Sequence, residues 1–264
     1  HAADGEGYRV VAAATGEADR LNPQAAARLA TAFRSWRMMT GDRQEAARAY
    51  FSEHAESWDQ LRSLHVPDNA VETALLKLIG KRPFQSMLDL GTGTGRLLEI
   101  LAPFYARGIG IDLSREMLSV ARANLDRAGV THAQVRQGDI FAAQIERNAF
   151  DLVTMHQVLH YLDDPARAVR EAARMLRPAG RLVVVDFAPH SLDMLRDRHA
   201  HQRLGFSDQQ MREWFEAAEL DMEDSQSFHP AQPAEDKLTV KLWLGRDRRM
   251  LVADPVFEKA RVVA

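Results

Sequence analysis

The chain has 264 residues, of which 46% are hydrophobic and 27% charged, as in a globular protein with one large domain or one domain and an appendage. It has no cysteine, which excludes disulfides, thiolate metal sites and a cysteine nucleophile. The net charge of −3 gives no global attraction to nucleic acid or anionic membranes. The sequence shows neither an apolar stretch long enough to span a membrane nor a signal peptide, so we expect a cytoplasmic protein.

The first part of the chain predicts mainly helices. A short β-prone run over residues 8–11 is followed by residues 24–39, which have the spacing of a helix with one apolar face. Helical patterns continue over residues 44–79, where another amphipathic helix is expected to begin after Pro67. The apolar face of residues 24–39 needs a cover, either within the chain or at a dimer interface.

From Phe84 onward, apolar segments alternate with amphipathic ones. The expected strands cover residues 86–90, 108–111, 133–136, 150–155, 181–187 and 238–244, and the expected helices cover residues 95–104, 115–128, 164–176 and 208–218. This alternation predicts an α/β fold with a Rossmann-like, doubly wound sheet. The chain is accordingly divided into a helical N-terminal appendage (residues 1–43), a main domain (44–250) and a tail (251–264).

The strongest motif is a glycine loop after the first expected strand, Asp89-Leu90-Gly91-Thr92-Gly93-Thr94-Gly95. Glycine permits tight turns and lets a ligand approach the backbone closely. The spacing differs from the G-x-G-x-x-G of pyrophosphate loops, and the carboxylate of Asp89 favours a cationic or amino-bearing ligand instead. The candidate binding residues of this loop are Asp89, Gly91, Thr92, Gly93 and Gly95.

Two further aspartates follow the next two strands. Asp112 ends the second strand, where a carboxylate can accept hydrogen bonds from both hydroxyls of a ribose. Gly138 and Asp139 end the third, where Asp139 can accept from an adenine amine while Met117 and Ile140 sandwich the base. Each aspartate alone could be a turn former or a helix cap. Together, at the carboxyl ends of successive strands, the three acidic positions predict a ligand that contains a nucleoside.

These motifs resemble those of class I S-adenosylmethionine (SAM)-dependent methyltransferases, in detail the small-molecule enzymes related to the ubiquinone and menaquinone type. The resemblance extends over about residues 44–245 and is carried by residues 89–95, 110–114, 138–140, 150–153 and 176–182. It implies SAM as the methyl donor, S-adenosylhomocysteine as the product, and a seven-stranded sheet with an antiparallel final strand. It also implies that Leu113 contributes to donor binding.

Methyl transfer requires an aligned acceptor, exclusion of water and, for a protonated acceptor, a base. His156, after the fourth strand, lies where this fold presents side chains to the methyl group, so it is the first candidate for donor contact, substrate contact or base. His190, after the fifth strand, is the second catalytic candidate. His160 and Tyr161 are expected on the turn after the fourth strand, where packing is the more ordinary role.

The helix upstream of Pro67 carries several aromatic and partly polar residues. These are Tyr50, Phe51, His54 and Trp58. In a class I methyltransferase such a helix often covers the donor and acceptor, and Tyr50 would then contact the donor's carboxylate. Residues 51, 54 and 58 also have the spacing of an ordinary buried helix face, and this alternative stays open.

Metal binding is not expected. His199 and His201 do not share a helix face, and the H-E-x-x-H pattern is absent. The lack of cysteine also excludes the thiolate chemistry by which arsenite methyltransferases hold arsenic.

A narrower resemblance, over residues 49–67, is to bacterial ArsR-type regulators fused to a methyltransferase. It implies an upstream winged-helix domain that binds DNA, a last wing strand at residues 5–11 and a dimerisation helix at residues 24–39, hence a homodimer. Two functions therefore remain: a methyltransferase acting on a small molecule, and a transcriptional regulator that senses SAM or S-adenosylhomocysteine. The loop spacing disfavours an NAD-dependent oxidoreductase, and the missing N/D-P-P-Y motif disfavours a base methyltransferase.

Overall fold

The computed structural model describes Ala55 and residues 68–80, 83–143, 145–192, 202–230 and 237–249, all within one unit that begins at residue 48. The predicted wing strand (residues 5–11) and dimerisation helix (24–39) lie outside the described residues. The predicted division into appendage, main domain and tail therefore stays a prediction. Within the described part, no helix is long and apolar enough to cross a membrane.

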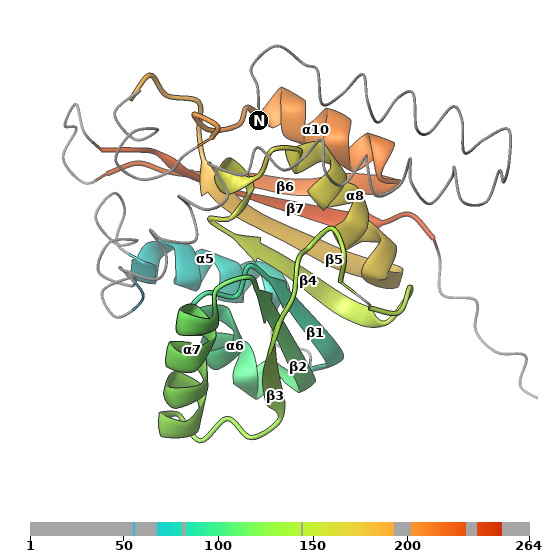
Figure 1. Ribbon diagram of the computed structural model, residues 1–264. Helices are drawn as coiled ribbons and strands as arrows, with labels where there is room; N and C mark the ends of the chain where they lie inside the picture. The colour runs from blue at the N-terminus through green and yellow to red at the C-terminus, as the bar shows by residue number, and fades with distance from the viewer. Residues whose placement is uncertain are drawn as a thin grey trace, which may run out of the picture. The chain divides into compact units, whose positions relative to one another are not determined.

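A seven-stranded sheet forms the centre of this unit (Figure 1). Its strands are β1 Phe84–Leu90, β2 Tyr105–Asp112, β3 Ala133–Gln137, β4 Phe150–His156, β5 Leu176–Phe187, β6 Leu220–Phe228 and β7 Val240–Asp247. They lie in the order β3-β2-β1-β4-β5-β7-β6. Strands β1 to β5 are mutually parallel, and β7 lies antiparallel between β5 and β6. The predicted doubly wound sheet with an antiparallel final strand is confirmed.

Helices cover both faces of the sheet (Figure 1). Helices α5 Asp68–Ile79, α6 Arg96–Leu101 and α7 Arg115–Arg127 pack on one face, and α8 Pro165–Met175 and α10 Asp208–Ala217 pack on the other. Two 3₁₀ turns, η2 Ala102–Phe104 and η3 Leu159–Tyr161, follow α6 and β4. The chain order reverses between β1 and β4, and open α/β sheets bind ligands at the carboxyl ends of strands at such a switch point.

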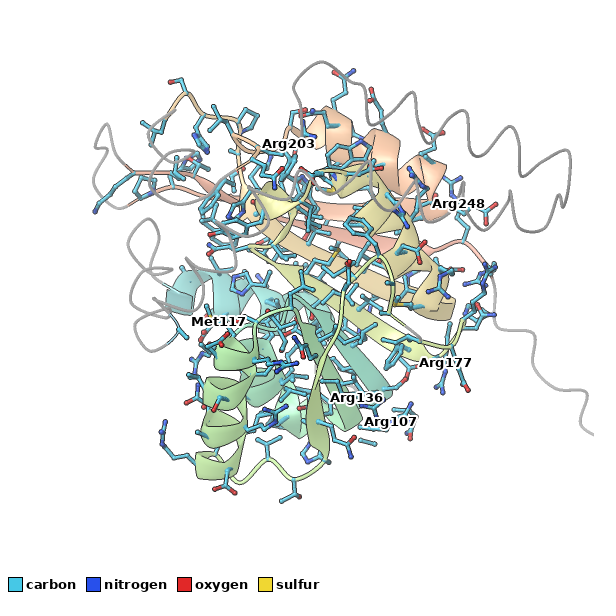
Figure 2. All side chains as sticks on the ribbon, in the orientation of Figure 1. Arg107, Met117, Arg136, Arg177, Arg203 and Arg248 are labelled. Atoms are coloured by element: carbon cyan, nitrogen blue, oxygen red, sulfur yellow. The ribbon has the colours of Figure 1, made fainter. Side chains whose placement is uncertain are left out.

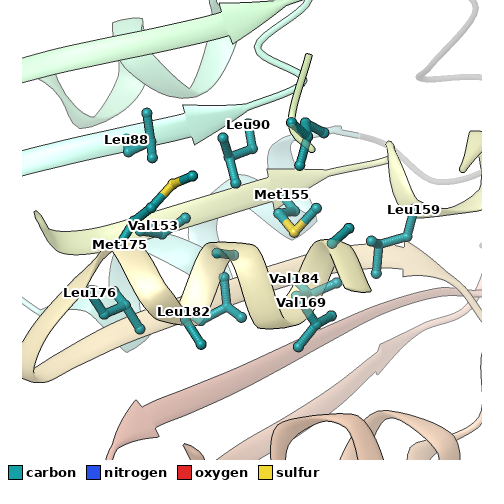
Figure 3. Close-up of a cluster of buried hydrophobic side chains, with 14 of the residues drawn as sticks. Leu88, Leu90, Val153, Met155, Leu159, Val169, Met175, Leu176, Leu182 and Val184 are labelled. Carbon is teal, nitrogen blue, oxygen red and sulfur yellow. The ribbon is translucent and has the colours of Figure 1, made fainter. Parts of the chain in front are cut away.

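Alternate residues of the central strands enter two separate cores. Leu152 of β4 packs on the α5–α7 side, whereas its neighbour Val153 packs on the α8–α10 side. Figure 3 shows the second core, in which Val169 of α8 packs with residues from three strands: Leu88, Leu90, Val153, Met155 and Val184. Burial on both faces explains why these strands are nearly continuous apolar runs in the sequence.

The structure differs from the sequence prediction at three elements. Strand β6 was not predicted, because its residues alternate between exposed and half-buried positions and most are polar. The single helix expected over residues 95–104 is α6 followed by η2, where Pro103 interrupts the α-helical pattern. Strand β5 already begins at Leu176, the residue at which the preceding helix was expected to end, because Leu176 pairs with Phe150 of β4.

Candidate functional site

The glycine loop turns sharply out of β1, with Gly91, Gly93 and Gly95 at φ values of 71°, 51° and 80°. Its first turn is fixed to β2, because the carbonyl oxygen of Ile111 accepts hydrogen bonds from the backbone N–H groups of Gly91 (2.8 Å) and Thr92 (2.9 Å). A Cβ atom at Gly91 would lie 2.5 Å from Cγ2 of Val158. Glycine is therefore required at position 91 for both its φ and its close contact with the segment after β4.

The carboxylate of Asp89 lies buried behind this loop and is only 2% exposed. It accepts hydrogen bonds from the hydroxyls of Thr92 (2.8 Å) and of Thr154 in β4 (2.6 Å). Asp89 thus joins β1, the loop and β4 and supports the loop from behind. A carboxylate held there also makes the electrostatic potential above the loop more negative, which favours a cationic ligand.

Asp112, the last residue of β2, contacts the other side of the loop. Its carboxylate accepts hydrogen bonds from the backbone N–H groups of Gly93 (2.8 Å) and Ser114 (2.9 Å). Burial raises the pKa of Asp112, and the hydrogen bonds that it accepts oppose this rise. Because each carboxylate oxygen has two lone pairs, Asp112 can still accept the two hydroxyls of a ribose.

The predicted adenine-binding residues lie on two connected segments. The N–H group of Gly138 donates to the carbonyl of Asp112 (2.9 Å), so the segment after β3 lies beside the one after β2. The carboxylate of Asp139 accepts from the N–H group of Phe141 (2.9 Å). The hydrophobic residues of these segments are Met117 and Ile140, which are buried, and Leu113, which is 38% exposed. Met117 lies in the first turn of α7 (Figure 2).

The two predicted catalytic histidines lie at the ends of neighbouring strands. His156 is the half-buried last residue of β4 and stands opposite Val185 of β5. His190 follows β5, where its N–H group donates to the carbonyl of Leu204 (3.0 Å) and its Nδ1 accepts from the N–H group of Leu192 (3.3 Å). Both lie on the carboxyl side of the sheet, as the sequence predicts.

A buried hydrogen-bonded pair, His160–Asp186, connects the ends of β4 and β5. Their side chains are 1% and 0% exposed, and Nδ1 of His160 lies 2.8 Å from Oδ1 of Asp186. The backbone N–H groups of His160 (3.3 Å) and Phe187 (2.8 Å) also donate to this carboxylate. His160 is on a turn, as expected, but sequence reasoning missed its pairing with Asp186. An aspartate at the end of a buried apolar strand is a signal for such a partner.

Several other predicted residues do not contribute to this site as described. Tyr50, Phe51, His54, Trp58, His199 and His201 lie outside the described residues, so the proposed covering helix and the Tyr50 contact stay predictions. The guanidinium of Arg96 binds the carboxylate of Glu72 at 2.7 and 2.8 Å, which joins α6 to α5 and raises the pKa of Arg96. Among the described residues, no three His, Asp or Glu side chains are grouped as metal ligands.

Comparison with known proteins agrees with this arrangement. Residues 88–184 match the model of a methyltransferase domain family. The uncharacterized methyltransferase YcgJ of Bacillus subtilis is 30% identical over 168 residues, which cover 59% of this chain and 64% of that protein. This part of the chain is thus similar to methyltransferase domains. The expected cofactor, SAM, agrees with this family.

Other similar proteins show how much of this chain, and of each methyltransferase, the similarity covers. The ubiquinone biosynthesis O-methyltransferase of Paracidovorax citrulli is 36% identical over 136 residues, covering 50% of this chain and 57% of that enzyme. The chain thus spans less than two thirds of the length of these two relatives. A crystal structure of a putative methyltransferase from Bacillus halodurans has the same fold, with a TM-score of 0.60, 21% identity and coverage of 68% of this chain and 99% of that one.

The segment before the methyltransferase domain matches a different kind of model. Residues 1–57 match a domain of unknown function with ARM repeats. The relatives described above are named as methyltransferases. The resemblance of residues 49–67 to ArsR-type regulators therefore stays a prediction from the sequence.

Proposed function

We propose that the protein transfers the methyl group of SAM to an oxygen atom of a small-molecule acceptor. One observation carries this proposal: Asp89 and Asp112 hold the glycine loop from two sides at the carboxyl ends of β1 and β2. The matching methyltransferase domain model supports the donor, and the names of the O-methyltransferase relatives support an oxygen acceptor. The sulfonium of SAM is already an activated leaving group, so the protein mainly aligns the acceptor and excludes water.

In this proposal the donor extends along the strand ends in the order of the sheet. Its adenine lies at the end of β3, its ribose at the end of β2 and its methionine part over the loop after β1. The residues assigned to the donor are Tyr50, Asp89, Gly91, Thr92, Gly93, Gly95, Asp112, Leu113, Met117, Gly138, Asp139, Ile140 and His156. The next strand beyond the loop is β4, so the methyl group points towards the acceptor side of the sheet.

The acceptor then lies over β4 and β5, beside His156 and His190. We assign His156 as the base that takes the acceptor's proton and His190 as a substrate contact, because they follow the two strands beyond the donor. The His160–Asp186 pair is a positioning element. It fixes the turn after β4 against the end of β5, and Asp186 holds the imidazole in one orientation.

The experiment is calorimetric binding of SAM, S-adenosylhomocysteine and NAD⁺, followed by transfer assays with tritiated SAM and phenolic acceptors such as catechol. We expect both sulfur compounds to bind with a Kd below about 1 mM, NAD⁺ not to bind, and label to enter the acceptor. Absence of SAM and S-adenosylhomocysteine binding would contradict the proposal.

A regulator that senses these ligands is the second proposal, and residues 49–67 are the feature that favours it. It predicts ligand-dependent DNA binding by a homodimer that carries the implied upstream winged-helix domain. A gel-shift assay with and without S-adenosylhomocysteine tests it. Binding of both ligands with no transfer to any acceptor would favour this second function over the first.

A further inference from the structure

One side chain of helix α7, the amide of Asn124, reaches the glycine loop from outside the sheet. Its Nδ2 donates a hydrogen bond to the backbone carbonyl of Thr94 (3.1 Å), and the side chain is half-buried there. About one turn earlier on α7, Ala121 is fully buried, and a Cβ atom at Gly95 would lie 3.2 Å from its Cβ. Helix α7, which lies beside α6 (Figure 1), therefore packs closely against the second half of the loop.

The peptide group between Thr94 and Gly95 is thereby fixed at both ends. Its carbonyl accepts from Asn124, and its N–H group donates to the carbonyl of Thr92 (2.9 Å). The carboxylate of Asp89 in turn holds the hydroxyl of Thr92 (2.8 Å). Because glycine adopts positive and negative φ values about equally well, this peptide group could otherwise turn over at Gly95, where φ is 80°. The bond from Asn124 favours one of the two orientations.

The N-terminal end of the same helix is fixed by the aspartate that we assign to the ribose. The carboxylate of Asp112 accepts from the N–H group of Ser114, the N-cap of α7, and from that of Gly93 in the loop. Helix α7 is therefore tied to the loop twice, through Asp112 at its first turn and directly through Asn124. The loop, Asp112 and α7 form a closed ring of contacts, and Asn124 completes this ring.

We propose that Asn124 is a positioning residue for the donor. Its amide holds the loop in the shape that accepts the methionine part of the donor, and it acts through the loop and not by contact with the ligand. This proposal rests on the proposed function, which puts the methionine part over this loop. A loop that already has its bound shape loses less conformational freedom on binding, so the ligand binds more tightly. The alternative is an ordinary packing role, in which donor affinity does not depend on Asn124.

The first test uses two variants, Asn124→Asp and Asn124→Leu. Both replacements have nearly the shape of asparagine, and neither can donate a hydrogen bond to Thr94. The aspartate keeps an oxygen for Arg127, whose Nη1 donates to Oδ1 of Asn124 (3.1 Å), whereas leucine does not. We expect both variants to bind S-adenosylhomocysteine about 3–10-fold more weakly in calorimetry, the effect of one neutral hydrogen bond. A loss confined to Asn124→Leu would assign the effect to Arg127 and overturn the proposal.

The matched control is Tyr105→Phe, which also removes one side-chain hydrogen bond to a backbone carbonyl on the same face of the sheet. The hydroxyl of Tyr105 donates to the carbonyl of Leu98 in α6 (2.7 Å). We expect Tyr105→Phe and Asn124→Asp each to lower the Tm by roughly 2–4 °C. Only Asn124→Asp should lower the affinity for S-adenosylhomocysteine by more than about twofold. Equal losses of affinity in both variants would show a general loosening of the fold and overturn the proposal.

The second test separates the two halves of the ligand. The probe is 5′-methylthioadenosine, which has the adenosine and the sulfur of S-adenosylhomocysteine but lacks the amino-acid part. We expect Asn124→Asp to bind this probe within about twofold of the unaltered protein, because the loop serves the methionine part. A loss as large as that for S-adenosylhomocysteine would assign Asn124 to the adenosine side or to the whole fold, and would overturn the proposal.

The third test measures amide hydrogen exchange at Gly95 by NMR in the full chain without ligand. We expect the N–H group of Gly95 to exchange at least tenfold faster in Asn124→Asp, and saturating S-adenosylhomocysteine to slow it again. The internal control is the N–H group of Gly91, which donates to the carbonyl of Ile111 (2.8 Å) and should exchange as in the unaltered protein. Equal acceleration at both glycines, or none at Gly95, would overturn the proposal.

Failure of the proposed function gives a different result. If the unaltered protein did not bind S-adenosylhomocysteine, the proposed methyl transfer would be contradicted whatever the variants do. If the unaltered protein bound it and both Asn124 variants bound it equally well, only the role of Asn124 would be wrong.

Discussion

At the scale of single residues, the carboxylate of Asp112 fixes the glycine loop and also keeps lone pairs that a ligand could use. It accepts hydrogen bonds from the backbone N–H groups of Gly93 and Ser114, which belong to the loops after β1 and β2. These bonds fix the carboxylate at the position where a ribose is expected. Because burial raises its pKa, Asp112 is protonated at a higher pH than an exposed aspartate.

Asp112→Asn is expected to weaken S-adenosylhomocysteine binding by about 10–100-fold, because hydrogen bonds to a charged acceptor contribute about 1.5–3 kcal/mol each. In the unaltered protein, affinity should fall as the pH drops through the raised pKa of Asp112. The free energy of unfolding changes in the opposite direction. The raised pKa of Asp112 stabilises the fold below the ordinary aspartate pKa, and this stabilisation is lost as the pH rises through the pKa of Asp112 in the folded protein. Calorimetry and urea unfolding at several pH values measure both trends.

The control for this experiment is Asp126→Asn, which changes an exposed residue of α7. We expect it to leave both the affinity and its pH dependence unchanged. If Asp112→Asn binds S-adenosylhomocysteine as tightly as the control does, the ribose assignment is wrong.

Candidate site residues with a local sequence signal could be predicted, whereas contacts that depend on tertiary pairing could not. Asp89 and Gly91 flank the end of β1 and Asp112 ends β2, so the strand patterns beside them identify them as candidates. His160 and Asp186 are separated by 26 positions and meet only because β4 and β5 pair. The left-handed backbone conformation of Gln157 (φ 52°) is likewise not revealed by the sequence.

At the scale of elements, one aspartate attaches helix α10 to the antiparallel edge of the sheet. The carboxylate of Asp208, in the first turn of α10, lies 2.5 Å from Nζ of Lys241 on β7. It also accepts from Nε1 of Trp243 on β7 (2.7 Å) and from the hydroxyl of Ser225 on β6 (2.8 Å). Partial burial favours a higher pKa for Asp208, but the hydrogen bonds that it accepts outweigh this effect. The pKa of Asp208 therefore lies below the ordinary aspartate value.

Asp208→Asn is therefore expected to lower the free energy of unfolding at pH 7 by about 1–2 kcal/mol. A lowered pKa stabilises the fold above the ordinary aspartate pKa, and this stability is lost as the pH falls through the folded value. The variant should consequently lose less stability than the unaltered protein during acid titration. Urea unfolding measured by circular dichroism between pH 7 and 3 would show this.

A matched control is Asp221→Asn, which removes an exposed pair with Arg248 on the same edge. Exposed ion pairs contribute little, so we expect a change below about 1 kcal/mol. An equal loss in both variants would mean that Asp208 does not hold α10 in place.

The elements themselves were predicted unequally. The buried strands β1, β4 and β5 are apolar runs, which sequence periodicity identifies. Strand β6 carries Asp221, Glu223, Ser225 and Ser227 on its exposed side, and among the described strands it pairs with β7 alone. Such a polar edge strand looks like a loop in the sequence, because its extended form comes from pairing with β7 and not from burial.

At the scale of the whole molecule, the proposed donor site joins the ends of three strands. A ligand that binds the folded state alone stabilises it by about 2.7 kcal/mol at a hundredfold excess over its Kd. We therefore expect saturating S-adenosylhomocysteine to raise the Tm by roughly 5–10 °C. Differential scanning fluorimetry measures this, with Asp112→Asn at the same ligand concentration as the comparison. No rise in Tm for the unaltered protein would contradict donor binding to the native fold.

The position of β7 in the sheet has a consequence for synthesis on the ribosome. Strand β5 ends at Phe187, but its antiparallel neighbour runs from Val240 to Asp247. Until that last strand leaves the exit tunnel, the nascent chain exposes an open strand edge along β5, and β6 has no strand to pair with. Such edges are prone to pair with other chains. The unpaired edge of β5 thus stays open to aggregation while about sixty further residues are synthesised. We expect chaperones to protect the nascent chain most during this stage.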